Sequence, residues 1–183
     1  MLLNQCPHNL DLLQWICGMP VRVRAFCHEG KWHDIEVEDD VTAYMEFENG
    51  ATGVFITSTG DAPGTNRFEV LGEMGKLVCD GKGLTFYKLN VNEREFNKKE
   101  KQGFASPKHT VIDIESDGMT EQHSAVMNAF AAAILRGEPL VAGGEEGING
   151  LMLSNAMHLS SWKGEMVSLP VDEDEYLSAL NEK

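Results

Sequence analysis

The sequence predicts an α+β fold, in which a largely antiparallel sheet carries helices packed on one face. Three patterns predict it: a helical segment opens the chain, residues 21–114 contain several short alternating segments separated by glycine turns, and apolar residues return at helical spacing after residue 120. With 183 residues, 42% of them hydrophobic, the chain is long enough to bury a core as one domain over residues 1–183.

The first helix is predicted to begin near Asn4 and to end at Gly18, with Pro20 blocking any extension. Pro7 is compatible with this position because the amides of a first helical turn have no intrahelical acceptor to lose.

One face of this predicted helix carries the candidate functional residues. Asn4, His8, Asp11 and Trp15 are spaced four, three and four residues apart, so a helix would place them in one row. An amide, an imidazole and a carboxylate in register form a candidate small-molecule site. The alternative interpretation is that Asn4 caps the helix, His8 is a surface histidine and Asp11 is solvated.

Alternating apolar and polar residues then predict strands at residues 21–27, 41–47, 51–58, 67–71, 76–79, 84–89 and 109–114. Asn49-Gly50 predicts a tight hairpin turn, because both residues tolerate positive φ. In the strand after this turn, Val54 and Ile56 are expected to face the core. Residues 91–106 are polar and charged, and we expect a solvated excursion there.

The last third of the chain is predicted to be mainly helical. Helices are expected at residues 120–136, 146–162 and 172–180, with a short strand at residues 166–169. Gly137 and Pro139 end the first of these helices.

Composition excludes several classes of function. The formal net charge of −14 argues against nucleic acid or an anionic membrane surface as a partner. The chain has no apolar run of membrane-spanning length and no signal peptide, so a cytoplasmic location is expected. Its four cysteines show no zinc-ligand spacing, so we expect buried free thiols and no metal site.

Several segments, in this order and spacing, resemble one known family. They are the opening run with His8 and Asp11, residues 47–53 (FENGATG), 68–77 (FEVLGEMGKL), 130–139 (FAAAILRGEP) and 160–164 (SSWKG). Together they resemble the C-terminal domain of the glucose–fructose oxidoreductase / inositol dehydrogenase / rhizopine catabolism (Gfo/Idh/MocA) family of NAD(P)-dependent oxidoreductases. The resemblance implies a glyceraldehyde-3-phosphate dehydrogenase-like C-terminal domain whose open sheet face pairs subunits into a homo-oligomer.

The family's cofactor-binding signals are missing from this sequence. It has no G-x-G-x-x-G fingerprint and no Glu-Lys-Pro motif, and the nearest glycine-rich run, residues 143–150 (GGEEGING), places two glutamates where a pyrophosphate would lie. We therefore expect a substrate-binding and oligomerisation domain without the N-terminal dinucleotide-binding domain. On that expectation NAD or NADP binds to the full-length protein only, and this fragment alone is inactive.

The resemblance also implies roles for individual residues. His8 takes the hydroxyl proton while a secondary alcohol of a sugar, cyclitol or related polyol loses hydride to the nicotinamide. Asn4 is the second catalytic candidate and stands where the family commonly has aspartate. Asp11 binds a neighbouring substrate hydroxyl, and His123 is a further substrate-binding candidate. Two other functions stay open: a non-catalytic dimerisation or scaffold domain, and a cofactor-independent sugar lyase or isomerase.

Overall fold

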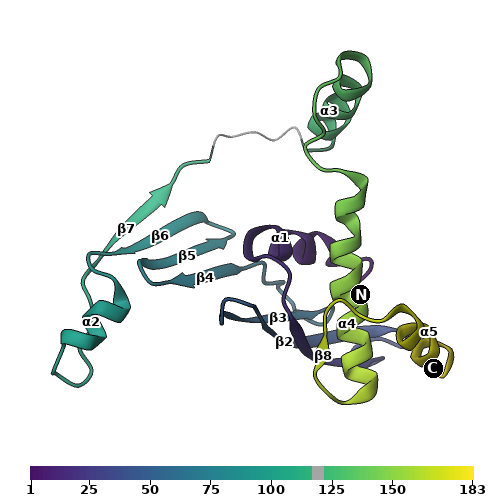
Figure 1. Ribbon diagram of the computed structural model, residues 1–183, viewed down its shortest axis with the longest axis horizontal. Coiled ribbons are helices and arrows are strands. Elements are labelled where there is room, and N and C mark those ends of the chain that lie inside the picture. Colours follow the sequence, from purple (N-terminus) through teal and green to yellow (C-terminus); the bar gives the residue numbers. More distant parts are fainter. Residues whose placement is uncertain (117–121) are drawn as a thin grey trace. The chain divides into compact units, whose positions relative to one another are not determined.

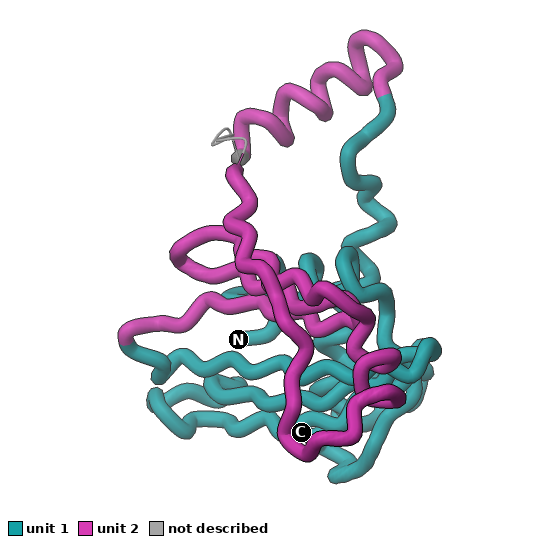
Figure 2. The backbone as a smooth tube through the Cα atoms, turned by 90° about the vertical axis from the view of Figure 1, so that its left-hand side faces the viewer, with its two compact units in different colours: residues 1–62, 139–183 teal, residues 63–138 magenta. Residues whose placement is uncertain are grey.

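The computed structural model describes residues 1–116 and 122–183, which divide between two compact units (Figure 2). Unit 1 comprises residues 1–62 and 139–183, and unit 2 comprises residues 63–138. Helices accompany antiparallel strands, so the predicted α+β class is confirmed. The described strands form two four-stranded sheets, one in each unit, where the sequence pattern predicted a single sheet.

Unit 1 contains a sheet of strand order β3-β2-β1-β8 together with the helices that hold the candidate site (Figure 1). In chain order its elements are α1 (Pro7–Cys17), β1 (Arg22–Glu29), β2 (Glu38–Glu46), β3 (Thr52–Ser58), the 3₁₀ turn η1 (Gly144–Glu146), α4 (Gly147–Lys163), β8 (Val167–Ser168) and α5 (Glu173–Asn181).

The core of unit 1 lies where α4 packs against β1. Alternate residues of the two central strands are fully buried, as the alternation of the sequence predicts. The side chains with no exposed area include Val23, Ala25, Val41, Ala43 and Met45 from the sheet and Leu153, Ala156, Met157 and Leu159 from α4.

Two serines at the C-terminal end of α4 complete the hydrogen bonding of β1. Strand β8 pairs with only the first two residues of β1, so the backbone beyond them needs other partners. The Ala25 N–H donates to Ser160 Oγ at 2.9 Å, and the Cys27 N–H donates to Ser161 Oγ at 2.9 Å. Ser160 Oγ in turn donates to the carbonyl of Glu165 at 2.6 Å.

The expectation that Val54 and Ile56 face the core is wrong. Their side chains are 61% and 71% exposed, whereas Phe55 is 8% exposed. The reason is register: Phe55 lies opposite the buried Ala43, Val54 lies opposite Tyr44, and antiparallel partners point to the same side of a sheet. A period of two cannot by itself say which of its two faces is buried.

The first helix is shorter than its sequence predicts. Helix α1 begins at Pro7 with Cys6 at the N-cap, and Asn4 lies in the preceding turn, where its N–H donates to the Met1 carbonyl. The placement of Asn4 on the helical face is therefore wrong. The physical reason is that the residue before a proline avoids helical dihedrals. The C-terminal end is as predicted, with Gly18 at φ 80° donating its N–H to the Gln14 carbonyl.

Two adjacent acidic residues at the start of β2 are buried and fully engaged. Asp39 accepts hydrogen bonds from the backbone N–H groups of Lys31, Trp32 and His33 at 2.7–2.9 Å, which fixes the loop between β1 and β2. Burial opposes ionisation of Asp39, but these three donors outweigh it and hold its pKa below the ordinary value.

Glu38 is the second of these buried carboxylates. Burial alone would raise its pKa, but His158 and the Met1 and Leu2 nitrogens hold the pKa well below its usual range. The His158 ring also stacks on Trp162 with centroids 5.5 Å apart. Glu38 and His158 are thus parts of the packing of α4 against the sheet.

Unit 2 contains a sheet of strand order β4-β5-β6-β7 with antiparallel neighbours. Its elements are β4 (Phe68–Gly72), β5 (Gly75–Asp80), β6 (Gly83–Leu89), α2 (Glu93–Lys99), β7 (His109–Ile114) and α3 (Gln122–Arg136). Helix α2, capped by the Asn92 side chain, lies within the predicted polar excursion and was not predicted. The predicted start of the later helix, near residue 120, falls outside the described residues.

Ser160→Ala tests the link between α4 and β1. It removes the acceptor of the Ala25 N–H from a fully buried position, so we expect unfolding to become easier by about 1–3 kcal/mol. Urea denaturation measures this, with Ser178→Ala on the exposed side of α5 as the matched control. Equal stability of the two variants would contradict the assigned role.

Candidate functional site

A cavity of about 280 Å³ lies between the N-terminal parts of α1 and α4, within unit 1. It brings together two of the sequence-predicted site residues, His8 and Asp11, whose spacing of three places them on one face of α1. The remaining lining residues are Leu2, Leu3, Pro7, Gly147, Gly150 and Leu151.

Burial of the opposite side of α1 holds this arrangement in place. Leu10 and Leu13 are 1% and 7% exposed, and the helix packs against α4. His8 and Asp11 are exposed to the cavity side, so their polar atoms are accessible to a ligand. The apolar periodicity that predicted the helix therefore also orients its polar face.

The wall opposite α1 is formed by the backbone of the first turn of α4. A Cβ atom added at Gly147 or Gly150 would meet no heavy atom within 4 Å, so open space adjoins both residues. Any larger side chain here would project into this space. The two glycines therefore allow a ligand to approach the helix backbone closely.

Asp11 is connected to α4 through a chain of amides that the sequence interpretation missed. The Gln14 Nε2 donates to Asp11 Oδ1 at 2.9 Å, and the Asn149 Nδ2 donates to Gln14 Oε1 at 3.3 Å. Gln14 is only 8% exposed. A polar residue one turn after Asp11, on the side of the helix otherwise used for packing, was the signal available in the sequence.

The other two predicted site residues do not line this cavity. Asn4 lies in the turn before α1, with an exposed side chain. His123 lies in unit 2, near the start of α3, and its side chain is exposed there.

The first part of the glycine-rich run, residues 143–146 before α4, does not fit a dinucleotide phosphate. Glu146 accepts the Gly143 N–H at 3.3 Å, and a Cβ atom at Gly143 would lie 2.8 Å from the Glu145 carboxylate. At Gly143 the backbone donor and the adjoining space are thus occupied by carboxylates, which would repel a phosphate.

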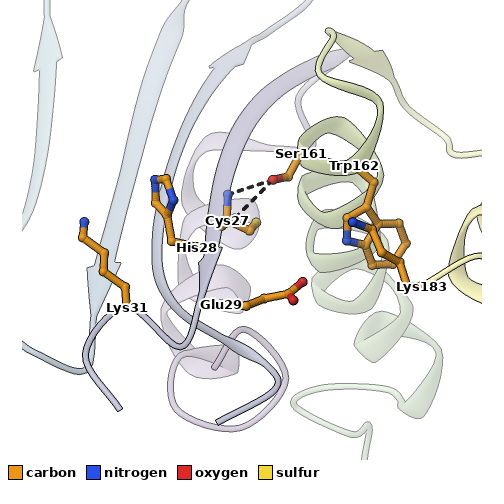
Figure 3. Close-up of a pocket in the computed structure, with 7 residues that line it drawn as sticks. All are labelled: Cys27, His28, Glu29, Lys31, Ser161, Trp162 and Lys183. Carbon is orange, nitrogen blue, oxygen red and sulfur yellow. Dashed lines mark hydrogen bonds between the residues drawn. The ribbon is translucent and has the colours of Figure 1, made fainter. Parts of the chain in front are cut away.

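A larger cavity, of about 410 Å³, lies at the end of β1 and the C-terminal end of α4. Figure 3 shows His28 and Lys31 pointing to one side of the β1 end, while Trp162 and Lys183 lie on the other. Cys27, Glu29 and Ser161 complete the lining.

The thiol in this larger cavity is not a nucleophile at neutral pH. Burial raises the pKa of Cys27 to about 11, which outweighs the hydrogen bond with Ser161. The backbone N–H of Cys27 donates to the Ser161 hydroxyl, and this hydroxyl donates to the Cys27 carbonyl (Figure 3). We therefore assign this cavity to the packing of α4 on β1 and the candidate site to the smaller one.

Residues 1–116 and 122–183 contain neither a metal-ligand cluster nor a membrane-spanning helix. Within them, no three His, Cys, Asp or Glu side chains are grouped closely enough to hold a metal ion. None of the helices in these residues has the length and apolarity required to cross a bilayer.

A known family model matches the segment that carries His8 and Asp11. Residues 1–78 match the family model described as the GFO/IDH/MocA C-terminal domain. This segment is therefore similar to the C-terminal domain of that family. The predicted resemblance to this family of NAD(P)-dependent oxidoreductases is confirmed, and the matched segment includes His8, Asp11 and Gln14.

Individual relatives extend the comparison to most of the chain. The WlbA dehydrogenase of Chromobacterium violaceum, solved in complex with NADH and UDP-GlcNAcA, is 27% identical and covers 92% of this chain and 46% of its own, with a TM-score of 0.64. A levoglucosan dehydrogenase solved with NADH and levoglucosan is 17% identical and shares the fold, with a TM-score of 0.67, 92% coverage of this chain and 50% of its own.

A curated relative, the uncharacterised protein y4oX of Sinorhizobium fredii, is 30% identical over 108 residues, which are 55% of this chain and 30% of that protein. The chain therefore spans about half the length of these solved structures and less of the curated relative.

Alkylation of the cysteines tests the assignment of the larger cavity. At neutral pH we expect iodoacetamide to label Cys79 and Cys17, which are exposed, well before Cys27, whose raised pKa keeps it protonated. Mass spectrometry of timed samples measures the order, and labelling in denaturant is the control. Labelling of Cys27 ahead of both others would contradict the assignment.

Proposed function

We propose that this chain is the substrate-side domain of an NAD(P)-dependent dehydrogenase that oxidises a secondary alcohol of a sugar, cyclitol or related polyol. The observation that carries the proposal is the cavity that joins His8 and Asp11 within the segment matched by the family. The two solved relatives described above, each in complex with NADH, support the nature of the cofactor.

In the proposed reaction, side chains of this chain accept a proton and bind hydroxyl groups of the substrate. The His8 imidazole accepts the proton of the hydroxyl that becomes a carbonyl, since an imidazole is a suitable general base near neutral pH. Asp11 accepts a hydrogen bond from a neighbouring hydroxyl of the substrate and so orients the substrate. NAD or NADP would supply the hydride acceptor, and it is proposed to bind outside this chain because Glu145 and Glu146 occupy the space and the N–H group at Gly143.

Asn4 and His123 are secondary candidates for the site, because neither lines the cavity. Asn4, in the turn before α1, is close enough in sequence to influence His8, but its amide cannot stabilise an imidazolium by charge. A substrate contact of His123, on α3 of unit 2, stays a prediction.

His8→Ala in the complete protein tests the proposal. We expect kcat/KM to fall by about two to four orders of magnitude, the usual contribution of a general base. Thermal unfolding should be unchanged, because the exposed imidazole contributes little packing. His28→Ala, at another exposed histidine, is the matched control.

Asn4→Asp separates a catalytic from a structural role of the same helix. A carboxylate added in the turn before α1, four positions before His8, is expected to stabilise the imidazolium, so the acid limb of the pH–rate profile should move to higher pH. Turnover of sugars without any nicotinamide would favour a lyase or isomerase instead. Loss of folding in His8→Ala with no specific kinetic effect would overturn the proposed role of α1.

We further propose that the open face of the unit 1 sheet forms a homo-oligomer. Phe26, Val54 and Ile56 are 51%, 61% and 71% exposed on this face, beside Tyr44, and such an apolar patch is unusual on a monomer. A self-complementary pairing with two-fold symmetry would cover it.

Val54→Glu tests this pairing. Light scattering at roughly tens of micromolar should show an oligomer for the unaltered chain and a monomer for the variant, because the introduced charges would be buried against apolar side chains. Ser178→Glu on α5 is the control. A monomer in every sample would contradict the proposal.

A further inference from the structure

The polar side chains that line the cavity between α1 and α4 determine which ligands it can accept. It is lined by one carboxylate, Asp11, and one imidazole, His8, and the other lining groups are apolar side chains or glycines. No lysine or arginine lines it within the part of the chain that the structure describes. A carboxylate or phosphate entering this cavity would face Asp11 without a permanent cation to neutralise it.

The orientation of the Asp11 carboxylate is determined by an amide chain that crosses from α1 to α4. Gln14 donates to Asp11 Oδ1 at 2.9 Å and accepts from Asn149 Nδ2 at 3.3 Å. The donation from Asn149 requires the Gln14 oxygen to face α4, so the Gln14 nitrogen must face Asp11. Because Gln14 is 8% exposed, bulk water cannot easily replace either partner.

This arrangement has a consequence for ligands. An ionised carboxylate is an acceptor only, with about four lone-pair sites, and one donor from Gln14 leaves capacity for further donors. Hydroxyl groups supply such donors, whereas carboxylate and phosphate groups supply none when ionised. The cavity therefore matches an uncharged polyhydroxy group.

We propose that Gln14, held by Asn149, is a positioning residue for Asp11, and that this carboxylate selects an uncharged, hydroxyl-bearing part of the substrate over a carboxylate- or phosphate-bearing part. The inference rests on the proposed function, because it concerns the same cavity. It adds two residues to the site and narrows the substrate class.

The first experiment titrates the 183-residue chain with glucose and myo-inositol, and separately with glucuronate and glucose 6-phosphate. NMR signals of His8 and of the Gly147 and Gly150 amides report binding in the cavity. We expect the neutral compounds to bind about tenfold more tightly than the anions, and Asp11→Asn to abolish most of this difference because the repulsion is removed.

The second experiment asks whether Gln14 acts through Asp11. Gln14→Met keeps the length and suits a buried position, yet it removes the donor, so affinity for the neutral compounds should fall about tenfold. In an Asp11→Asn background the same substitution should have almost no further effect, whereas a merely structural role gives independent effects. Gln102→Met, at an exposed position of unit 2, is the matched control.

The outcomes separate the two proposals. Tighter binding of the anions, or independent effects of Gln14→Met and Asp11→Asn, would overturn the inference and leave the cavity as the substrate site. No perturbation of His8, Gly147 or Gly150 by any of the four compounds would overturn the proposed function, and the inference with it. Asn149→Ala should reproduce a weaker form of the Gln14→Met effect.

Discussion

The contact of α4 with β1 is the constraint on which the rest of unit 1 depends. Apolar side chains such as Met157 and Leu159 are fully buried, and the hydroxyls of Ser160 and Ser161 pair with β1 backbone that β8 is too short to reach. Helix α1 packs in turn against α4 (Figure 1), so the position of the candidate site follows from this contact. A shift of α4 along its axis would move Gly150 relative to Asp11 and change the cavity.

The chain uses its carboxylates in two different ways, and this difference helps to locate the site. Asp39 accepts three backbone hydrogen bonds and Glu38 is held by His158 and the first two backbone nitrogens, so both are committed to the fold. Asp11 accepts one side-chain donor and lines a cavity. Acidic residues are common in a protein with a formal net charge of −14, so an acidic residue alone does not indicate a binding site. A carboxylate that can still accept hydrogen bonds from a ligand is a better indication.

Cavity size is a poor guide in this molecule. The larger cavity presents a thiol whose pKa is raised to about 11 and polar groups that point to different sides (Figure 3). The smaller one presents His8 and Asp11 from a single helix face, and these residues lie in the segment that the family model matches. Asn149 lies outside that segment, so the chain of amides joins a family-matched helix to a part of the chain related to known proteins by fold.

The sequence by itself determined the class of fold, the alternation of β1 and β2, and the row of His8 and Asp11 on α1, because each is encoded by residues within one or two turns or strand repeats. The tertiary structure alone decided the rest. The buried side of β3 depends on its register with β2, and the division of the strands into two sheets depends on which strands pair. The contact of Gln14 with Asn149 spans 135 positions, a separation at which local periodicity carries no information.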